Sequence, residues 1–95
     1  MSGPRTYQSR ERVQAMSFDG TQAFADAIRA WVVEVEPTEY VEVYVDRSHP
    51  HASFIWLTAS DVLLRGGQWL ILGEYSKWFA RYNYDFVARF HEVEQ

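Results

Sequence analysis

The chain of 95 residues contains no cysteine, a single lysine and no long apolar run. Without cysteine it forms no disulfide, carries no thiol nucleophile and offers no thiolate to a metal ion. No stretch approaches the roughly 18–20 consecutive apolar residues of a membrane-spanning helix. The polar residues 1–12 also lack the apolar segment of a signal peptide. These absences predict a cytosolic protein that has no membrane partner.

The residue patterns of common catalytic sites are missing too. No serine stands in a G-x-S-x-G context, and no glycine-rich phosphate-binding loop is present. Glu42 and Asp46 alternate along a predicted strand that turns both carboxyl groups toward water rather than into a shared pocket. We therefore expect a protein that is not an enzyme, with no catalytic residue and no cofactor.

The strongest metal-ligand pattern is His49-Pro50-His51, with His91 as a possible third imidazole. Two histidines at positions i and i+2 of a strand share a face and can chelate a metal ion. Here the proline and the predicted loop break that regularity, and no acidic cluster adjoins the pair. A solvated loop is the preferred interpretation, so no metal site is predicted.

The composition is that of one small folded domain. Hydrophobic residues make up 47% of the chain and aromatic residues 17%, with four Trp, six Tyr and six Phe. Such a chain is too apolar to be disordered. Thirteen acidic residues against nine basic ones leave a formal charge of −4. Eight of the nine basic residues are arginines, which points to a GC-rich coding sequence rather than to a mechanism.

Residues 1–11 are predicted to be a flexible N-terminal arm, and residues 12–95 a single α+β domain. Residues 12–18 alternate as a first strand. Asp19 is expected to cap the following helix, with Gln22 reaching back in a capping box. Apolar residues then recur at helical spacing over residues 21–35, and Pro37 ends that amphipathic helix.

The rest of the chain has a strand-and-turn pattern. Residues 39–46 alternate clearly, and an aromatic strand over 53–59 is expected to pair with them. Further strands are predicted at 62–64, 69–72 and 77–82, with one helical turn and a short strand in the tail over 84–93. The predicted architecture is α+β: one amphipathic helix packed on a small, twisted antiparallel sheet of about five or six strands.

More aromatic rings are present than so small a core can hide. Those on the sheet face opposite the helix are expected to form an exposed strip, which is typical of a protein-contact surface. The residues assigned to this protein-binding surface are Tyr40, Glu42, Tyr44, Trp56, Trp78 and Tyr82. Two alternatives stay open: both sheet faces are partly covered, or the strip is a homodimer interface.

The distribution of charge along the chain distinguishes a basic partner from nucleic acid. Residues 21–60 hold six acids and two bases, a field that repels phosphate and attracts a basic partner, or that simply keeps the surface soluble. Rings and cations do alternate between Lys77 and Arg89, as in single-strand nucleic-acid binders. That segment is not net basic, however, so nucleic acid is the unfavoured partner.

Several motifs, in order, resemble a family of small uncharacterised proteins of tailed bacteriophages and prophages. The family begins with V-x-A-x-x-[WF]-x-G and continues with a P-G-D-W-I-I motif, G-E with an aromatic residue, and a closing F-x-x-x-[YF]-x-x-V. The counterparts here are Val13 to Gly20, Gly66 to Ile71, Gly73-Glu74-Tyr75, and Phe86 to Val93. Gly66 and Gln68 depart from the usual proline and aspartate of the second motif.

This resemblance implies a phage origin, and with the arginine excess it implies an actinobacterial host. It supplies no catalytic residue. The expected function is that of a non-enzymatic phage accessory protein in the host cytoplasm. It would bind a host protein and act in host takeover, growth inhibition or superinfection exclusion. The alternative is a minor virion or assembly protein that works through self-association.

Overall fold

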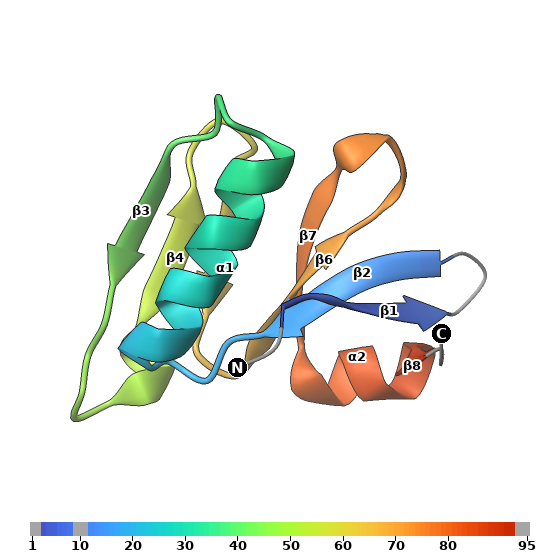
Figure 1. Ribbon diagram of the computed structural model, residues 1–95. Helices are drawn as coiled ribbons and strands as arrows, with labels where there is room; N and C mark the ends of the chain where they lie inside the picture. The colour runs from blue at the N-terminus through green and yellow to red at the C-terminus, as the bar shows by residue number, and fades with distance from the viewer. Residues whose placement is uncertain (1–2, 9–11, 93–95) are drawn as a thin grey trace.

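The computed structural model describes residues 3–8 and 12–92. These residues form eight strands, two α-helices and two short 3₁₀ turns (Figure 1). In chain order the elements are β1 (Arg5–Gln8), β2 (Arg12–Ser17), α1 (Gln22–Val35), β3 (Val41–Tyr44), η1 (Pro50–Ala52), β4 (Phe54–Leu57), β5 (Val62–Arg65), β6 (Gln68–Leu72), η2 (Glu74–Ser76), β7 (Trp78–Tyr82), α2 (Asn83–Arg89) and β8 (His91–Glu92). Neither described helix has the length and apolar character needed to cross a membrane.

The strands divide between two antiparallel sheets. One has five strands in the order β7-β6-β2-β1-β8, and the other has three in the order β3-β4-β5. The predicted α+β class, with a long amphipathic helix on antiparallel strands, is confirmed. The predicted single sheet did not include the division into two sheets, and the helical turn predicted in the tail is extended to the seven-residue helix α2.

The two sheets separate at the Gly66-Gly67 turn. In a tight hairpin the backbone N–H of Arg65 would bond to the carbonyl of Gln68. Here Arg65 N–H donates to the side-chain Oε1 of Gln68 at 2.7 Å, and the Gln68 carbonyl accepts from Phe18 N–H at 2.9 Å. Because β6 bonds to the β2 side of the molecule, the turn carries the chain from one sheet to the other.

Helix α1 begins one residue later than predicted and has a different cap. Thr21 is the N-cap residue, and its Oγ1 accepts from Phe24 N–H at 3.4 Å. Asp19 stands too far ahead of the first turn to cap it; its carboxylate instead accepts from the N–H and hydroxyl of Thr21. The predicted capping box is therefore wrong, and Gln22 donates to Asp26. The helix ends at Val35, before the predicted breaker Pro37.

The main core lies between the two sheets, where α1 is inserted (Figure 1). Ile28 and Val32 on the helix are fully buried, as the apolar stripe predicts. They pack among inward-facing residues of the three-stranded sheet (Val41, Ile55, Leu57, Leu64) and of β2, β6 and β7 (Met16, Leu70, Trp78). Each fully buried side chain of this kind contributes about 1.5–3 kcal/mol, so this layer holds the sheets together.

A second, smaller core lies on the opposite face of the five-stranded sheet and is covered by α2 (Figure 1). Phe86 of α2 is 1% exposed and stacks on Trp69 with the ring centres 4.0 Å apart. Phe90 stacks on Phe86 from the other side at 5.0 Å. The predicted helical turn and short final strand of the tail are present as α2 and β8.

Residues 5–8, which were predicted to belong to a flexible arm, form strand β1. This strand pairs with β2 from Arg5 opposite Ala15 to Gln8 opposite Arg12. These residues are held in a strand because the Tyr7 ring packs edge-on against Trp69 and Phe86, with ring centres 5.3 and 4.9 Å apart. Residues 1–2 and 9–11 of the predicted arm lie outside the described residues.

Candidate functional site

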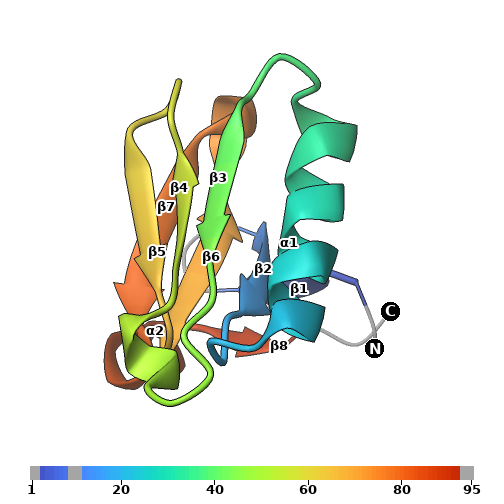
Figure 2. The same ribbon diagram turned by 90° about the vertical axis from the view of Figure 1, so that its left-hand side faces the viewer.

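The three-stranded sheet is covered on one face only. In Figure 2, helix α1 stands beside β3, the strands β6 and β7 lie behind the three-stranded sheet, and no described element lies over the face turned to the viewer. We call this uncovered side the outer face. Cross-strand pairing arranges its side chains in two rows: Glu42–Trp56–Leu63 and Tyr44–Phe54–Arg65. Tyr40 lies immediately before β3.

The outer face is rich in exposed rings and apolar groups. Tyr40 is 63% exposed, Tyr44 48%, Trp56 37% and Leu63 42%. The Tyr44 and Phe54 rings contact each other with centres 5.6 Å apart. A shallow hollow of about 370 Å³ lies beside Trp56, bordered by the charged side chains of Asp61 and Arg65. Large rings on a rigid sheet bury much area at little entropic cost, which suits them to macromolecular contact.

Four of the six residues predicted for a protein-binding surface meet on the outer face: Tyr40, Glu42, Tyr44 and Trp56. Tyr82 is 52% exposed, but it belongs to β7 of the other sheet and stacks on Tyr84 at 5.9 Å. It is therefore not part of the same face.

The prediction that Trp78 is exposed is wrong. Its side chain is 4% exposed and packs edge-on against Trp31 of α1, with ring centres 5.0 Å apart. Its indole Nε1 is buried without a hydrogen-bond partner. The reason is the strand's place in the fold: β7 belongs to the five-stranded sheet, and its Trp78 side points toward α1.

The sequence prediction missed Phe54, Leu63 and Arg65 on the outer face. Trp56 stands directly opposite Leu63, and Phe54 opposite Arg65, so both β5 residues share the face of the predicted tryptophan. The signal was the alternation in Val62-Leu63-Leu64-Arg65, in which Leu64 is fully buried and its neighbours point the other way.

Glu39, one of the predicted acidic surface residues, has a structural role. It is only 6% exposed, and its carboxylate accepts hydrogen bonds from Ala59 N–H at 2.7 Å and from Ser60 N–H at 3.1 Å. The Ser60 hydroxyl donates to it as well. This carboxylate holds the turn between β4 and β5, and so fixes one end of the outer face.

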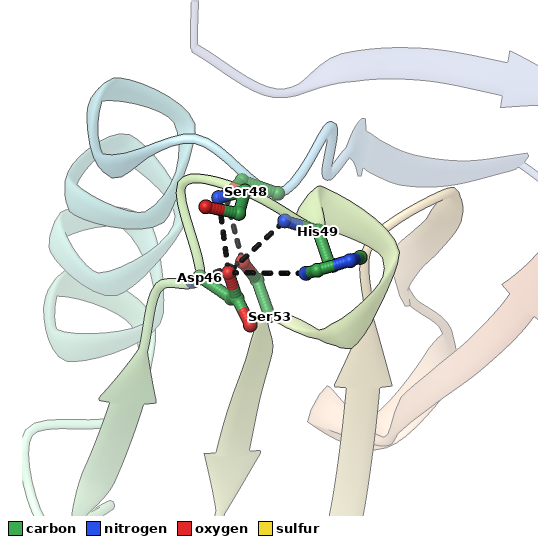
Figure 3. A network of polar contacts seen from close by, with 5 residues as sticks. Asp46, Ser48, His49 and Ser53 are labelled. Atoms are coloured by element: carbon green, nitrogen blue, oxygen red, sulfur yellow. Dashed lines mark hydrogen bonds and ion pairs between the residues drawn. The ribbon is translucent and has the colours of Figure 1, made fainter.

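At the other end, Asp46 organises the loop between β3 and β4 (Figure 3). Its Oδ1 accepts from the backbone N–H groups of Ser48 and His49, both at 3.0 Å, and lies 3.8 Å from the His49 imidazole. Chiefly because of the bond from His49 N–H, the pKa of Asp46 is lowered from its usual value. The backbone N–H of Asp46 donates to the buried Ser53 hydroxyl, which donates to the Gly20 carbonyl.

The other sequence hypotheses gain little from the structure. His49 and His51 lie edge-to-face at 5.9 Å, and no third ligand joins them within the described residues.

In the segment considered for nucleic-acid stacking, Arg81 and Arg89 both bind Asp85 at 2.8 Å. These two bonds lower the pKa of Asp85, and the bond from Arg89 has the larger effect. Both cations are thus already paired with an anion.

No known protein family, curated protein or solved structure matches this chain.

Proposed function

We propose that this chain is a non-enzymatic protein-interaction module and that the outer face is its contact surface. The observation that supports the proposal best is the group of exposed rings that β3, β4 and the residue before β3 present on one face of the sheet, whose other face packs on the core. Taking roughly 200 Å² for a fully exposed large side chain, Tyr40, Tyr44, Trp56 and Leu63 leave about 400 Å² accessible. A patch of that size on a single chain is often functional.

The proposed setting is an infected bacterial cell. The resemblance to small tailed-phage proteins supports a phage accessory protein that acts in the host cytoplasm by binding a host protein. Host takeover, growth inhibition and superinfection exclusion are the proposed outcomes of that binding. A mixed surface of tyrosine, tryptophan and arginine suits such a role, because these residues carry most of the binding energy in protein interfaces.

A pull-down from an actinobacterial host lysate tests the proposal, with Trp56→Ala as the test variant. Tyr84→Ala is the matched control, because Tyr84 is an equally aromatic side chain, 74% exposed, on α2. We expect a specific host protein to be retained by the wild type and by Tyr84→Ala, and to be lost with Trp56→Ala. Retention that is equal for all three, or absent for all three, contradicts the proposal.

The alternative role, a virion or assembly component, makes a different prediction. Mass spectrometry of purified phage particles would then detect the chain in the particle. An accessory protein that acts inside the cell is absent from the particle and abundant in the lysate.

A further inference from the structure

Glu42 stands in the middle of the outer face and has aromatic residues on three sides. Tyr40 and Tyr44 lie two residues before and after it on the same side of the chain, and Trp56 stands directly opposite it on β4. The bond from Thr58 N–H to the Tyr40 carbonyl, at 3.0 Å, continues the β3–β4 pairing past the end of the strand, so Tyr40 shares this side. Neighbours at such positions have Cβ atoms about 5–7 Å apart. Three rings therefore flank one carboxylate.

The Glu42 carboxylate is the uncompensated charge of the outer face. Its side chain is exposed, and among residues 3–8 and 12–92 it forms no ion pair. Asp61 and Arg65 both lie at the β5 edge, with β4 between them and Glu42. Their opposite charges leave that edge without net charge.

The rings add to the negative character of this part of the face. The face of an aromatic ring carries negative partial charge, so it repels an anion and attracts a cation. A carboxylate flanked by three such rings gives a site of negative potential, and no cation of the described residues pairs with it. The arrangement therefore favours a positively charged group from outside the chain.

We propose that this site binds an arginine side chain of the partner protein, with the guanidinium group stacked on a ring and hydrogen-bonded to the Glu42 carboxylate. Arginine fits better than lysine, because its guanidinium group is planar, more weakly hydrated than an ammonium group, and rich in N–H donors that lie in one plane. The flat side of that group can contact a ring while its edge donates to the carboxylate. We call Tyr40, Glu42, Tyr44 and Trp56 the arginine site.

The arginine site is built on a rigid support. The Tyr44 ring contacts Phe54 with ring centres 5.6 Å apart, and Ile55 and Leu57 anchor β4 in the core from the other face. A site that is ordered before binding loses little side-chain entropy when the partner arrives. Once a partner covers the outer face, the Coulomb attraction between arginine and Glu42 increases, because the local dielectric constant falls as water is excluded. Arginine is accordingly one of the residues that dominate the binding energy of interfaces.

The inference rests on the proposed function, in which the outer face is the contact surface, and names the chemistry of what that face contacts. The charge of the surrounding segment supports a basic partner. Residues 21–60 hold six acids and two bases, and this field attracts a basic surface at longer range than the contacts themselves.

A titration with N-acetyl-arginine amide at constant ionic strength, followed by two-dimensional proton–nitrogen NMR, tests the site. Each of the four tryptophans gives its own indole N–H signal. We expect the Trp56 indole signal and the backbone signals of residues 40–44 to shift, with a Kd on the order of 10 mM for this single residue. The indole signals of Trp31, Trp69 and Trp78 should not move. N-acetyl-lysine amide should bind about threefold more weakly or less tightly still.

Three variants locate the binding group. Glu42→Gln keeps the size of the side chain and removes its charge, so we expect it to weaken binding of N-acetyl-arginine amide about threefold or more. Glu34→Gln is the matched control, because Glu34 is an exposed carboxylate of α1 that lies beside Gln14 and away from the outer face. Asp61→Asn removes the other carboxylate of the outer face, and we expect it to leave the affinity unchanged, because Arg65 beside it already repels a cation. The same spectra show that each variant is folded.

Three results would each overturn the proposal: no shifts around Glu42, an affinity that Glu42→Gln leaves unchanged, or shifts that centre on Asp61 and disappear with Asp61→Asn. Equal affinities for the arginine and lysine amides would overturn the assignment to arginine. None of these results affects the proposed function, because a host protein can bind the outer face through its other groups. That proposal fails if retention of the host protein is insensitive to Trp56→Ala.

Discussion

The junction around Pro50 offers the strongest test of how the loops hold the outer face in place. A Cβ atom on Gly66 would lie 2.1 Å from the Pro50 carbonyl oxygen and 2.9 Å from its carbon. That oxygen also accepts Ser53 N–H at 3.1 Å, and Gly66 N–H donates to the Ser53 carbonyl at 3.1 Å. The loop between β3 and β4 is thereby pressed against the turn that separates the two sheets.

We expect Gly66→Ala to destabilise the fold by about 3 kcal/mol or more. The neighbour is backbone rather than a flexible side chain, so it moves only if the bonds to Ser53 are strained or broken, and overpacking alone costs about 1–3 kcal/mol. A domain of this size has a net free energy of unfolding on the order of 5–14 kcal/mol. The substitution therefore removes a large part of the stability.

Gly67→Ala is the matched control. Gly67 has φ +92°, but a Cβ at this position meets no atom within 4 Å. Its cost is conformational strain alone, about 1–2 kcal/mol. Urea denaturation followed by tryptophan fluorescence measures both variants. If Gly66→Ala lowers the free energy of unfolding by no more than Gly67→Ala does, the steric reasoning is refuted.

Three further changes have defined outcomes. Trp78→Ala should lower the free energy of unfolding by about 3–5 kcal/mol, because this ring is in the core, whereas Trp56→Ala should lower it by about 1 kcal/mol or less. Thermal denaturation measures both variants, and equal losses of stability would contradict this prediction. Tyr75→Asn with Ser76→Gly should stabilise the β6–β7 turn by about 1 kcal/mol, because both residues have positive φ, 60° and 57°; a lower melting temperature would contradict it. The pKa of Asp46 is lowered in the fold, so its stabilisation is present above the usual value of 3.8 and is lost as the pH falls through the folded pKa. The free energy of unfolding of Asp46→Asn should therefore fall less than that of the wild type between about pH 5 and pH 2, and parallel curves would argue against this role.

Local pattern was enough to predict much of the fold. In α1, β3 and β4 the apolar residues lie on one side of the element, and that side is buried. The three- and four-residue spacing in α1 and the alternation in β3 and β4 therefore indicate from the sequence alone both the type of element and its apolar side. The same holds for the tail, where Phe86 and Phe90 stack one helical turn apart. For the candidate site, alternation alone was sufficient to place Tyr40, Glu42, Tyr44 and Trp56 on one side of a hairpin.

What the tertiary structure decided is which side of each strand meets the core. Trp56 and Trp78 stand in equally plausible strands, yet Trp56 lies on the uncovered face of its sheet and Trp78 points toward α1, so the first ring is exposed and the second is buried. The strand β1 is held in place because the Tyr7 ring packs against Trp69 and Phe86, which are distant in sequence. Sequence periodicity defines two sides of an element, but only packing between distant elements determines which of them is excluded from water.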